Sequence, residues 1–181
     1  MNTIAQVKRN PLQLVLVSAC ALIAAAVGGN AAAADGNASA TTTVISALTI
    51  TKAEDLSFGN VIAGSTAGTI KVDTNGVRTV GGGVVLGSGT GTAAKFDITG
   101  SGTMTYTITY ASGVQLTGPG TAMSLTQISD ATGAGGASGL VTSGTLVAGL
   151  QSLFIGGTLD VGANQTGGLY TGSLTATVNY N

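Results

Sequence analysis

Side chains in the last twelve residues, YTGSLTATVNYN (170–181), alternate strictly between two kinds. The even positions, from Tyr170 to Tyr180, are apolar or small, and the odd positions are all Thr, Ser or Asn. Successive side chains of an extended chain point to opposite faces, so this period of two predicts a β-strand with one apolar face. Shorter runs of this kind recur from Val44 onward, and no window after residue 34 combines helical apolar spacing with a capping signal. The sequence therefore predicts an all-β fold.

Clusters of turn-forming residues divide the chain after residue 43 into about ten short strands. Twelve segments are the candidates for these strands: 44–52, 56–61, 68–73, 77–80, 82–87, 94–99, 103–110, 114–117, 123–128, 143–148, 152–162 and 170–181. Asn75-Gly76 is a strong hairpin signal because both residues tolerate positive φ, and the sequence Gly-Ser-Gly at 100–102 is a second. The glycine-rich sequence of residues 130–139, DATGAGGASG, predicts a mobile loop. Short strands at this spacing favour an immunoglobulin-like antiparallel β-sandwich.

Residues 1–34 have the layout of a secretory signal peptide. Lys8 and Arg9 precede an apolar run from Leu12 to Val27, and small residues at 31–34 predict cleavage after Ala33 or Ala34. The apolar run is shorter than the ~20 residues of a membrane-spanning helix, which disfavours an uncleaved anchor. Cys20, the only cysteine, lies inside this run, so the mature chain is expected to fold without a disulfide.

The charges after residue 34 are few. Four basic and seven acidic residues give a net charge of −3, with no basic cluster, which argues against nucleic-acid binding. The chain has no His, and its one Cys lies in the predicted signal peptide, so a histidine-assisted nucleophile and a zinc site are excluded. No cofactor is expected.

Carboxylates and tyrosines are the remaining candidates for chemistry. Asp97 and Asp160 form the only carboxylate pair that the sequence leaves open, and nothing in the sequence brings them together, so we do not expect an enzyme. The DTNG at 73–76 lacks the acidic ligands of a calcium loop and predicts a plain turn. Tyr106 and Tyr110 share a strand face, which is more typical of core packing than of a sugar-stacking platform.

Two motifs carry a family resemblance. LTITKAEDLSFGNVIAG (48–64) resembles the opening of secreted bacterial pilin-type domains, and GGLYTGSLTATVNYN (167–181) is similar to their ending. The texture of the whole mature chain resembles the family known as domain of unknown function 4402, with similarity to spore-coat-U-like subunits of chaperone-usher pili. Those subunits usually carry a disulfide near the first strand, and this chain departs from them there.

The resemblance implies a structural pilus or fimbrial subunit whose sandwich is incomplete and is completed by a donor strand. The implied partners are identical or related pilin subunits in a head-to-tail polymer, a periplasmic chaperone and an outer-membrane usher. The implied route runs through the periplasm to a cell-surface fimbrium or the extracellular space. The corresponding domains are a signal peptide at 1–34, a flexible N-terminal extension at 35–46 and a β-sandwich domain at 47–181.

Candidate residues exist for both halves of such a contact. The candidate donor strand comprises Ala40, Thr42, Val44, Ser46 and Leu48. The candidate acceptor groove comprises Phe58, Leu174, Ala176, Val178 and Tyr180. The sequence leaves open whether residues 44–52 are donor strand or the first strand of the domain itself. It also leaves open a second function, that of a secreted binding module or adhesin that does not polymerise, with Tyr106, Tyr110 and the loop around Asp130 as first suspects.

Overall fold

A computed structural model of the chain describes residues 33–181, whose regular structure consists of ten β-strands. In chain order these are β1 (Thr49–Glu54), β2 (Val61–Val72), β3 (Arg78–Leu86), β4 (Ala94–Thr99), β5 (Thr105–Tyr110), β6 (Gln115–Leu116), β7 (Met123–Asp130), β8 (Ser143–Thr145), β9 (Leu150–Val161) and β10 (Ala176–Tyr180). Residues 33–181 contain no helix, and therefore none that could cross a membrane, so the all-β prediction is confirmed. The predicted signal peptide lies almost wholly outside the described residues.

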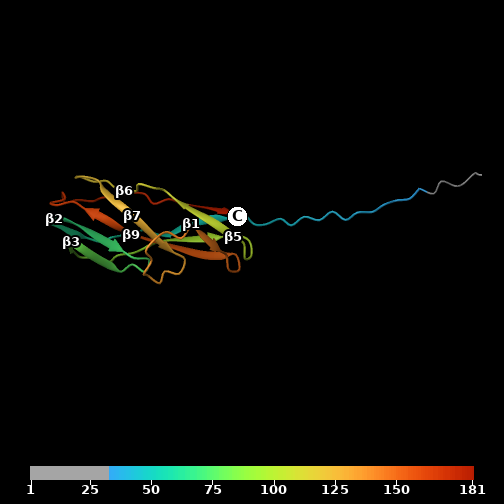
Figure 1. The fold of residues 1–181 in the computed structure, drawn as a ribbon, viewed down its shortest axis with the longest axis horizontal. Helices are drawn as coiled ribbons and strands as arrows, with labels where there is room; N and C mark the ends of the chain where they lie inside the picture. Colours follow the sequence, from blue (N-terminus) through green and yellow to red (C-terminus); the bar gives the residue numbers. More distant parts are fainter. Residues whose placement is uncertain (1–32) are drawn as a thin grey trace, which may run out of the picture. The chain divides into compact units, whose positions relative to one another are not determined.

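The strands form two antiparallel sheets, a seven-stranded and a three-stranded one (Figure 1). The larger sheet is built around β9, which pairs with β4 along its first half and with β2 along its second half. The opposite edge of β9 pairs with β7, which in turn pairs with β6, while β1 and β3 are the edges beyond β4 and β2. The smaller sheet has the order β10-β5-β8.

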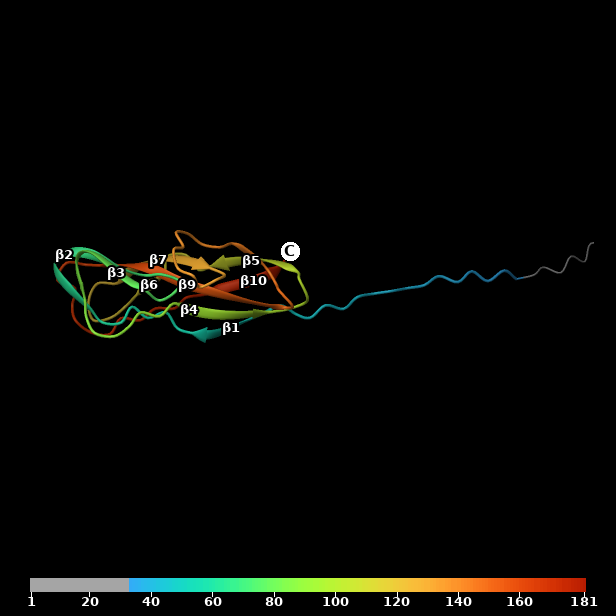
Figure 2. The ribbon, with the colours of Figure 1, turned by 90° about the horizontal axis from the view of Figure 1, so that it is seen from below.

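Two clusters of buried apolar side chains make up the core. One of them joins the sheets: Ile98 of β4 and Leu153 and Ile155 of β9 pack against Tyr106 and Ile108 of β5. Figure 2 shows β1 and β4 in the layer opposite β5. The other cluster gathers residues of β2, β3, β7 and β9 around Ile70, Leu125 and Leu159. The fold is therefore a β-sandwich, as the alternating patterns predicted.

Of the two predicted hairpins, one forms. Asn75 and Gly76 join β2 to β3, where Val72 pairs with Arg78 and Gly76 has a φ of 86°. The carboxylate of Asp73 accepts the N–H groups of Asn75 and Val77, so DTNG is a plain turn, as expected.

The hairpin predicted at Gly100 to Gly102 is wrong, because β4 and β5 belong to different sheets. Both strands bury an apolar face in the same core cluster, through Ile98 on β4 and through Tyr106 and Ile108 on β5. They therefore face each other across the core instead of pairing edge to edge, and residues 100–104 cross from one sheet to the other.

Two further sequence predictions need correction in the first half of the domain. Residues 56–60 are not a strand: Gly59 has a φ of 63°, and only Ser57 forms an isolated bridge, with Thr92. The glycines at 81–83 do not separate two strands but lie within β3, opposite a bulge in β2 between Ala63 and Gly68. A Cβ on Gly83 would collide with the carbonyl of Thr66, so this close approach of two backbones requires glycine.

Candidate functional site

The smaller sheet ends in a free edge. Among residues 33–181, β5 is the only strand that pairs with β10. Thr175 accepts a hydrogen bond from Ala111, and Asn181 donates one to Thr105, which places the odd-numbered residues of this segment in the hydrogen-bonded pairs. Because bonding direction alternates along an antiparallel strand, the N–H and C=O groups of Ala176, Val178 and Tyr180 point away from β5.

The edge strand of the larger sheet lies beside this free edge. β1 pairs with β4 only, and no ladder joins β1 to β10 in the described part of the chain. The two strands meet at one end, where the Tyr180 hydroxyl donates to the carbonyl of Ser46 at 3.0 Å and accepts the N–H of Ser101 at 2.7 Å. Within residues 33–181 the sandwich is thus closed at the Ser46 end, and β1 and β10 each keep one unpaired edge along this side.

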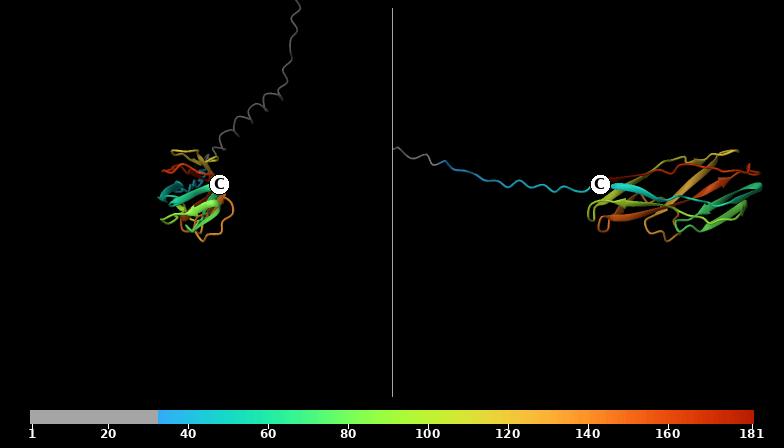
Figure 3. Two further views of the ribbon diagram at one scale, coloured as in Figure 1. Left: turned by 90° about the vertical axis from the view of Figure 1, so that its left-hand side faces the viewer. Right: turned by 180° about the vertical axis from the view of Figure 1, so that it is seen from behind.

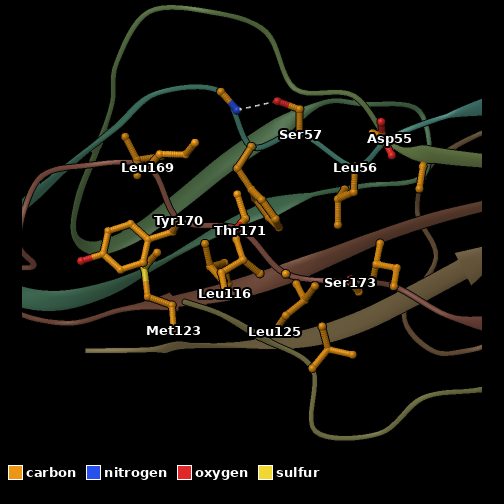
Figure 4. A pocket seen from close by; sticks show the side chains of 18 of the residues that line it. Asp55, Leu56, Ser57, Leu116, Met123, Leu125, Leu169, Tyr170, Thr171 and Ser173 are labelled. Carbon is orange, nitrogen blue, oxygen red and sulfur yellow. Dashed lines mark hydrogen bonds between the residues drawn. The ribbon is translucent and has the colours of Figure 1, made fainter. Parts of the chain in front are cut away.

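Beyond β1 and β10 the same side opens into a cleft of about 780 Å³. One wall is residues 52–61, and the other is residues 168–174. The floor is the apolar core itself, with Val114, Met123, Leu125 and Leu159 lining it. Figure 4 shows Leu56 and Ser57 at the top, the segment from Leu169 to Ser173 across the middle, and Met123 and Leu125 below it.

Hydrogen bonds fix both walls. The Arg78 guanidinium donates to the carbonyls of Phe58 and Asn60 at 3.1 and 3.3 Å, and to those of Gly87 and Gly89. The Tyr170 hydroxyl donates to the carbonyl of Thr166 at 2.8 Å and accepts the N–H of Gly120 and the amide of Gln165, both at 2.9 Å. The chain itself therefore holds the cleft open. Its floor is apolar, and the charged residues Lys52, Glu54 and Asp55 lie in one of its walls.

The predicted acceptor residues lie along this side in two groups. Phe58 and Leu174 line the cleft. Ala176, Val178 and Tyr180 do not; they are half-buried on β10 and pack against the core cluster that joins the sheets, while Thr177 and Asn179 between them are exposed. The alternation in the sequence thus gives the correct inward face of β10.

The predicted donor residues also fall into two groups, one exposed and one packed against the core. Ala40, Thr42, Val44 and Ser46 lie outside the strands and are exposed, with Val44 90% exposed. Leu48 is half-buried and packs against the core. Since Thr49 to Glu54 pair with β4 of the same chain, the segment from Leu48 onward belongs to the domain, and Leu48 is not part of a free donor strand. Residues 44–47 are not in a strand of the domain, and their role as donor stays a prediction.

The sequence did not single out the rest of the cleft. Leu56, Val61, Leu116, Met123, Leu125 and Tyr170 line it too. Met123 and Leu125 alternate with polar residues in MSLTQI and so read as ordinary core positions. The alternation marks the inward face of a strand, but it carries no signal for whether a further strand covers that face.

The carboxylate pair that the sequence left as a candidate for chemistry does not come together in the fold. Asp97 pairs across the ladder with Ser152 of β9, and Asp160 lies eight residues further along β9, about 26 Å away at ~3.3 Å per residue. Residues 33–181 hold no group of three or more side chains that could bind a metal ion.

The tyrosines do not form an exposed platform. Tyr106 is 1% exposed, and burial raises its pKa. The Tyr110 hydroxyl donates to the Val141 carbonyl at 2.7 Å and lies 2.9 Å from the Ser129 hydroxyl. Burial raises the pKa of Tyr110 as well, although the bond with Ser129 acts in the opposite direction. Tyr106 thus has the core role that the sequence favoured.

A family model described as Domain of unknown function (DUF4402) matches residues 48–180. The match begins one residue before β1 and ends on the last residue of β10, so it spans every strand and both walls of the cleft. No curated protein and no solved structure gives a match. Similarity to spore-coat-U-like subunits stays a prediction. The match covers well over half of the sequence, and the chain belongs to the DUF4402 family.

Proposed function

We propose that the chain is a structural subunit of a bacterial surface pilus or fimbria, assembled by donor-strand exchange. In this assembly the N-terminal extension, residues 35–46, of one copy adds as a strand along the free edge of β10 in the next copy. The extension of each added copy enters the copy before it, and this head-to-tail contact does not close, so it produces a filament.

One observation carries the proposal: within residues 33–181, β1 and β10 each keep one unpaired edge on the same side of the sandwich, next to a cleft with an apolar floor. A free edge with inward apolar side chains is a template for another strand, and folded proteins normally cover such edges. Added strands gain affinity from backbone pairing and register from alternate side chains. The exposed segment that contains Ala40, Thr42, Val44 and Ser46 supplies such a strand in every copy.

The same edge requires protection before assembly. We propose that a periplasmic chaperone lends a strand to β10 after the signal peptide, residues 1–34, has directed secretion, and that an outer-membrane usher exchanges that strand for the extension of the next subunit. The fibre then stands on the cell surface. Neighbouring genes for a chaperone and an usher would support this route.

The test is the behaviour of the surface material on a denaturing gel. Unboiled material should run as a ladder of multimers and collapse to one band after strong heating, since donor strands dissociate only when the sandwich unfolds. Deletion of residues 35–46 should leave folded monomer and remove the ladder. Val44→Asp should weaken the ladder, and Thr43→Asp, which places the same charge on the other face, is the matched control. A ladder that survives the deletion would contradict the proposal.

The alternative, a secreted binding module that does not polymerise, predicts a different result. The purified protein would be a monodisperse monomer that is retained on a glycan surface, and no ladder would appear. The burial of Tyr106 removes one of the two side chains that a sugar platform would use. We therefore prefer the pilus subunit.

A further inference from the structure

A rigid turn at residues 147–150, here called the apical turn, exposes two large apolar side chains. Val147 is 70% exposed and Leu150 is 60% exposed. The two residues exchange backbone hydrogen bonds of 2.9 and 3.0 Å, and Ala148 and Gly149 between them have positive φ. Gly149 also donates to Gly102 at 2.7 Å and accepts from Gly100 at 2.9 Å. The apical turn is therefore closed by two hydrogen bonds of its own and anchored to residues 100–102 by two more, and it presents its apolar side chains in a fixed place.

The apical turn lies at the end of the domain where the N-terminal extension enters. Leu150 pairs with Thr99, which pairs with Thr49, so Leu150 and the start of β1 are separated by two strand spacings, about 10 Å. A Cβ on Gly100 would also contact Leu48 and Tyr180. Figure 3 shows the orange apical turn at the same end as the C-terminus.

The opposite end of the acceptor side carries a complementary apolar side chain. Leu169 is 80% exposed and lies in the wall of the cleft, at the part of residues 168–174 farthest from β10 (Figure 4). Residues 166–173 contain no charged side chain, and neither do residues 98–105 or 143–150 around the apical turn. Contact between these two surfaces would therefore desolvate no charge.

The direction of the donor strand decides which surfaces meet. The hydrogen bond from Tyr180 to Ser46 and the packing of Leu48 close the groove at one end, whereas the cleft leaves it open at the other. A donor strand can therefore leave the acceptor only past residues 168–174, which makes it run antiparallel to β10, the more stable arrangement. The domain that follows the donor strand in the same chain then begins next to Leu169 of the acceptor, and its apical turn faces that residue.

We propose, on the basis of the proposed function, that the apical turn of each copy packs against Leu169 at the cleft rim of the copy that receives its donor strand. The partner is thus a second copy of this chain, held by a contact beside the donor strand. This contact fixes the angle between successive domains. The donor strand alone would leave them joined by a flexible connection.

The test compares the stiffness of fibres with the binding of the donor strand. The variant Val147→Glu/Leu150→Glu should still form a ladder, and its monomer lacking residues 35–46 should bind a synthetic 35–46 peptide as the unaltered monomer does. Its fibres should bend more in electron micrographs, with a persistence length reduced several-fold. Adding Leu169→Lys, which places a positive charge opposite the new carboxylates, should restore much of that stiffness.

A matched variant, Ser138→Glu/Leu140→Glu, adds the same charge on exposed residues of another loop and should leave stiffness unchanged. Fibres of Val147→Glu/Leu150→Glu with normal stiffness would overturn the inference while leaving the proposed function intact. Failure of the unaltered protein to bind the peptide or to form a ladder would instead overturn the proposed function.

Discussion

Arg78 occupies an unusual position for a charged side chain. Its guanidinium donates to four backbone carbonyls, those of Phe58, Asn60, Gly87 and Gly89, and thereby ties two irregular segments to β3. Only a planar fork with five donors can reach that many carbonyls at once, because the lysine ammonium has three donors at a single point. Arg78 therefore both stabilises the domain and sets the position of one wall of the cleft.

Replacing Arg78 by Lys should lower the free energy of unfolding by about 2–3 kcal/mol, because hydrogen bonds from a charged donor contribute roughly 1.5–3 kcal/mol. Urea denaturation followed by intrinsic fluorescence measures the change. Lys52→Ala is the control: Lys52 pairs with Asp55 in an exposed ion pair, which contributes at most about 1 kcal/mol. Equal stability of Arg78→Lys and the unaltered protein would show that the four contacts do not stabilise the fold.

Asp130 ends β7 and holds the start of the following loop. Burial acts to raise the pKa of this carboxyl, but hydrogen bonds from the Thr74 hydroxyl and from the N–H groups of Gly133 and Thr132 outweigh burial and hold the pKa below its usual value of 3.8. A carboxyl whose pKa is lower in the folded state stabilises the fold above its unfolded pKa. That stabilisation is lost as pH falls through the folded pKa.

The stability difference between the unaltered protein and Asp130→Asn should therefore be largest near neutral pH. It should begin to shrink as the pH falls below about 4, where the carboxyl of the unfolded chain becomes protonated, and it should be lost as the pH falls through the lower pKa of the folded state. Urea denaturation at a series of pH values measures it. Asp160→Asn, on an exposed position of β9, serves as the control. A difference that does not change with pH would contradict the role given to these hydrogen bonds.

At the scale of the element, β10 shows how one strand can serve two purposes. Its even-numbered side chains face the core, while the backbone groups of the same residues point to the free edge. A change at an even position therefore affects both packing and the surface offered to a donor strand, whereas a change at an odd position faces solvent. The odd positions Thr177 and Asn179 are exposed, in agreement with this division.

Val178→Asp should lower the free energy of unfolding by about 2–4 kcal/mol, because it places a charge against the core and removes apolar contacts. It should also reduce the amount of secreted subunit. Thr177→Asp, one residue away on the outer face, should change stability by about 0.5 kcal/mol or less. Thermal unfolding and the yield of secreted protein measure both variants. Normal secretion of Val178→Asp would argue strongly against the inward orientation.

The elements that the sequence predicted best are those with a purely local cause. The alternation in the last twelve residues produced β10, and Asn75-Gly76 produced the hairpin between β2 and β3, because both depend on residues adjacent in the chain. The strand predicted at 170–181 is nevertheless too long: Thr171 forms only an isolated bridge, and residues 172–175 are not in a strand. Residues 56–60 do not form the predicted strand because Gly59 adopts a positive φ and because Arg78 bonds to the carbonyl of Phe58, twenty residues away. That contact is tertiary and leaves no local pattern.

At the scale of the whole molecule, the open side can be closed artificially. Attaching residues 35–46 after Asn181 through a short glycine turn would let them run back along β10 in the direction that we propose for the donor strand. Val44 would then reach the apolar groove, and the free N–H and C=O groups of β10 would gain partners.

Such a grafted chain, with its own extension deleted, should be a monomer that is more stable than the deletion variant alone. The expected gain is about 3–5 kcal/mol, from burial of one valine at ~2 kcal/mol and from several new backbone hydrogen bonds. Calorimetry and analytical ultracentrifugation measure stability and assembly. A graft that carries Val44→Asp should lose much of the gain, and no stabilisation in either graft would contradict the acceptor role of this side.

The sequence by itself determined the all-β class, the inward face of β10 and the family. It could do so because side-chain alternation and turn residues act within a few residues of one another. Only the tertiary structure decided that β4 and β5 lie in different sheets, that Thr49 to Glu54 pair within the domain, and that, within residues 33–181, β1 and β10 each keep one unpaired edge beside a cleft. These features depend on which faces and edges meet across the core, and residues such as Met123 carry the same alternation whether a further strand covers them or not.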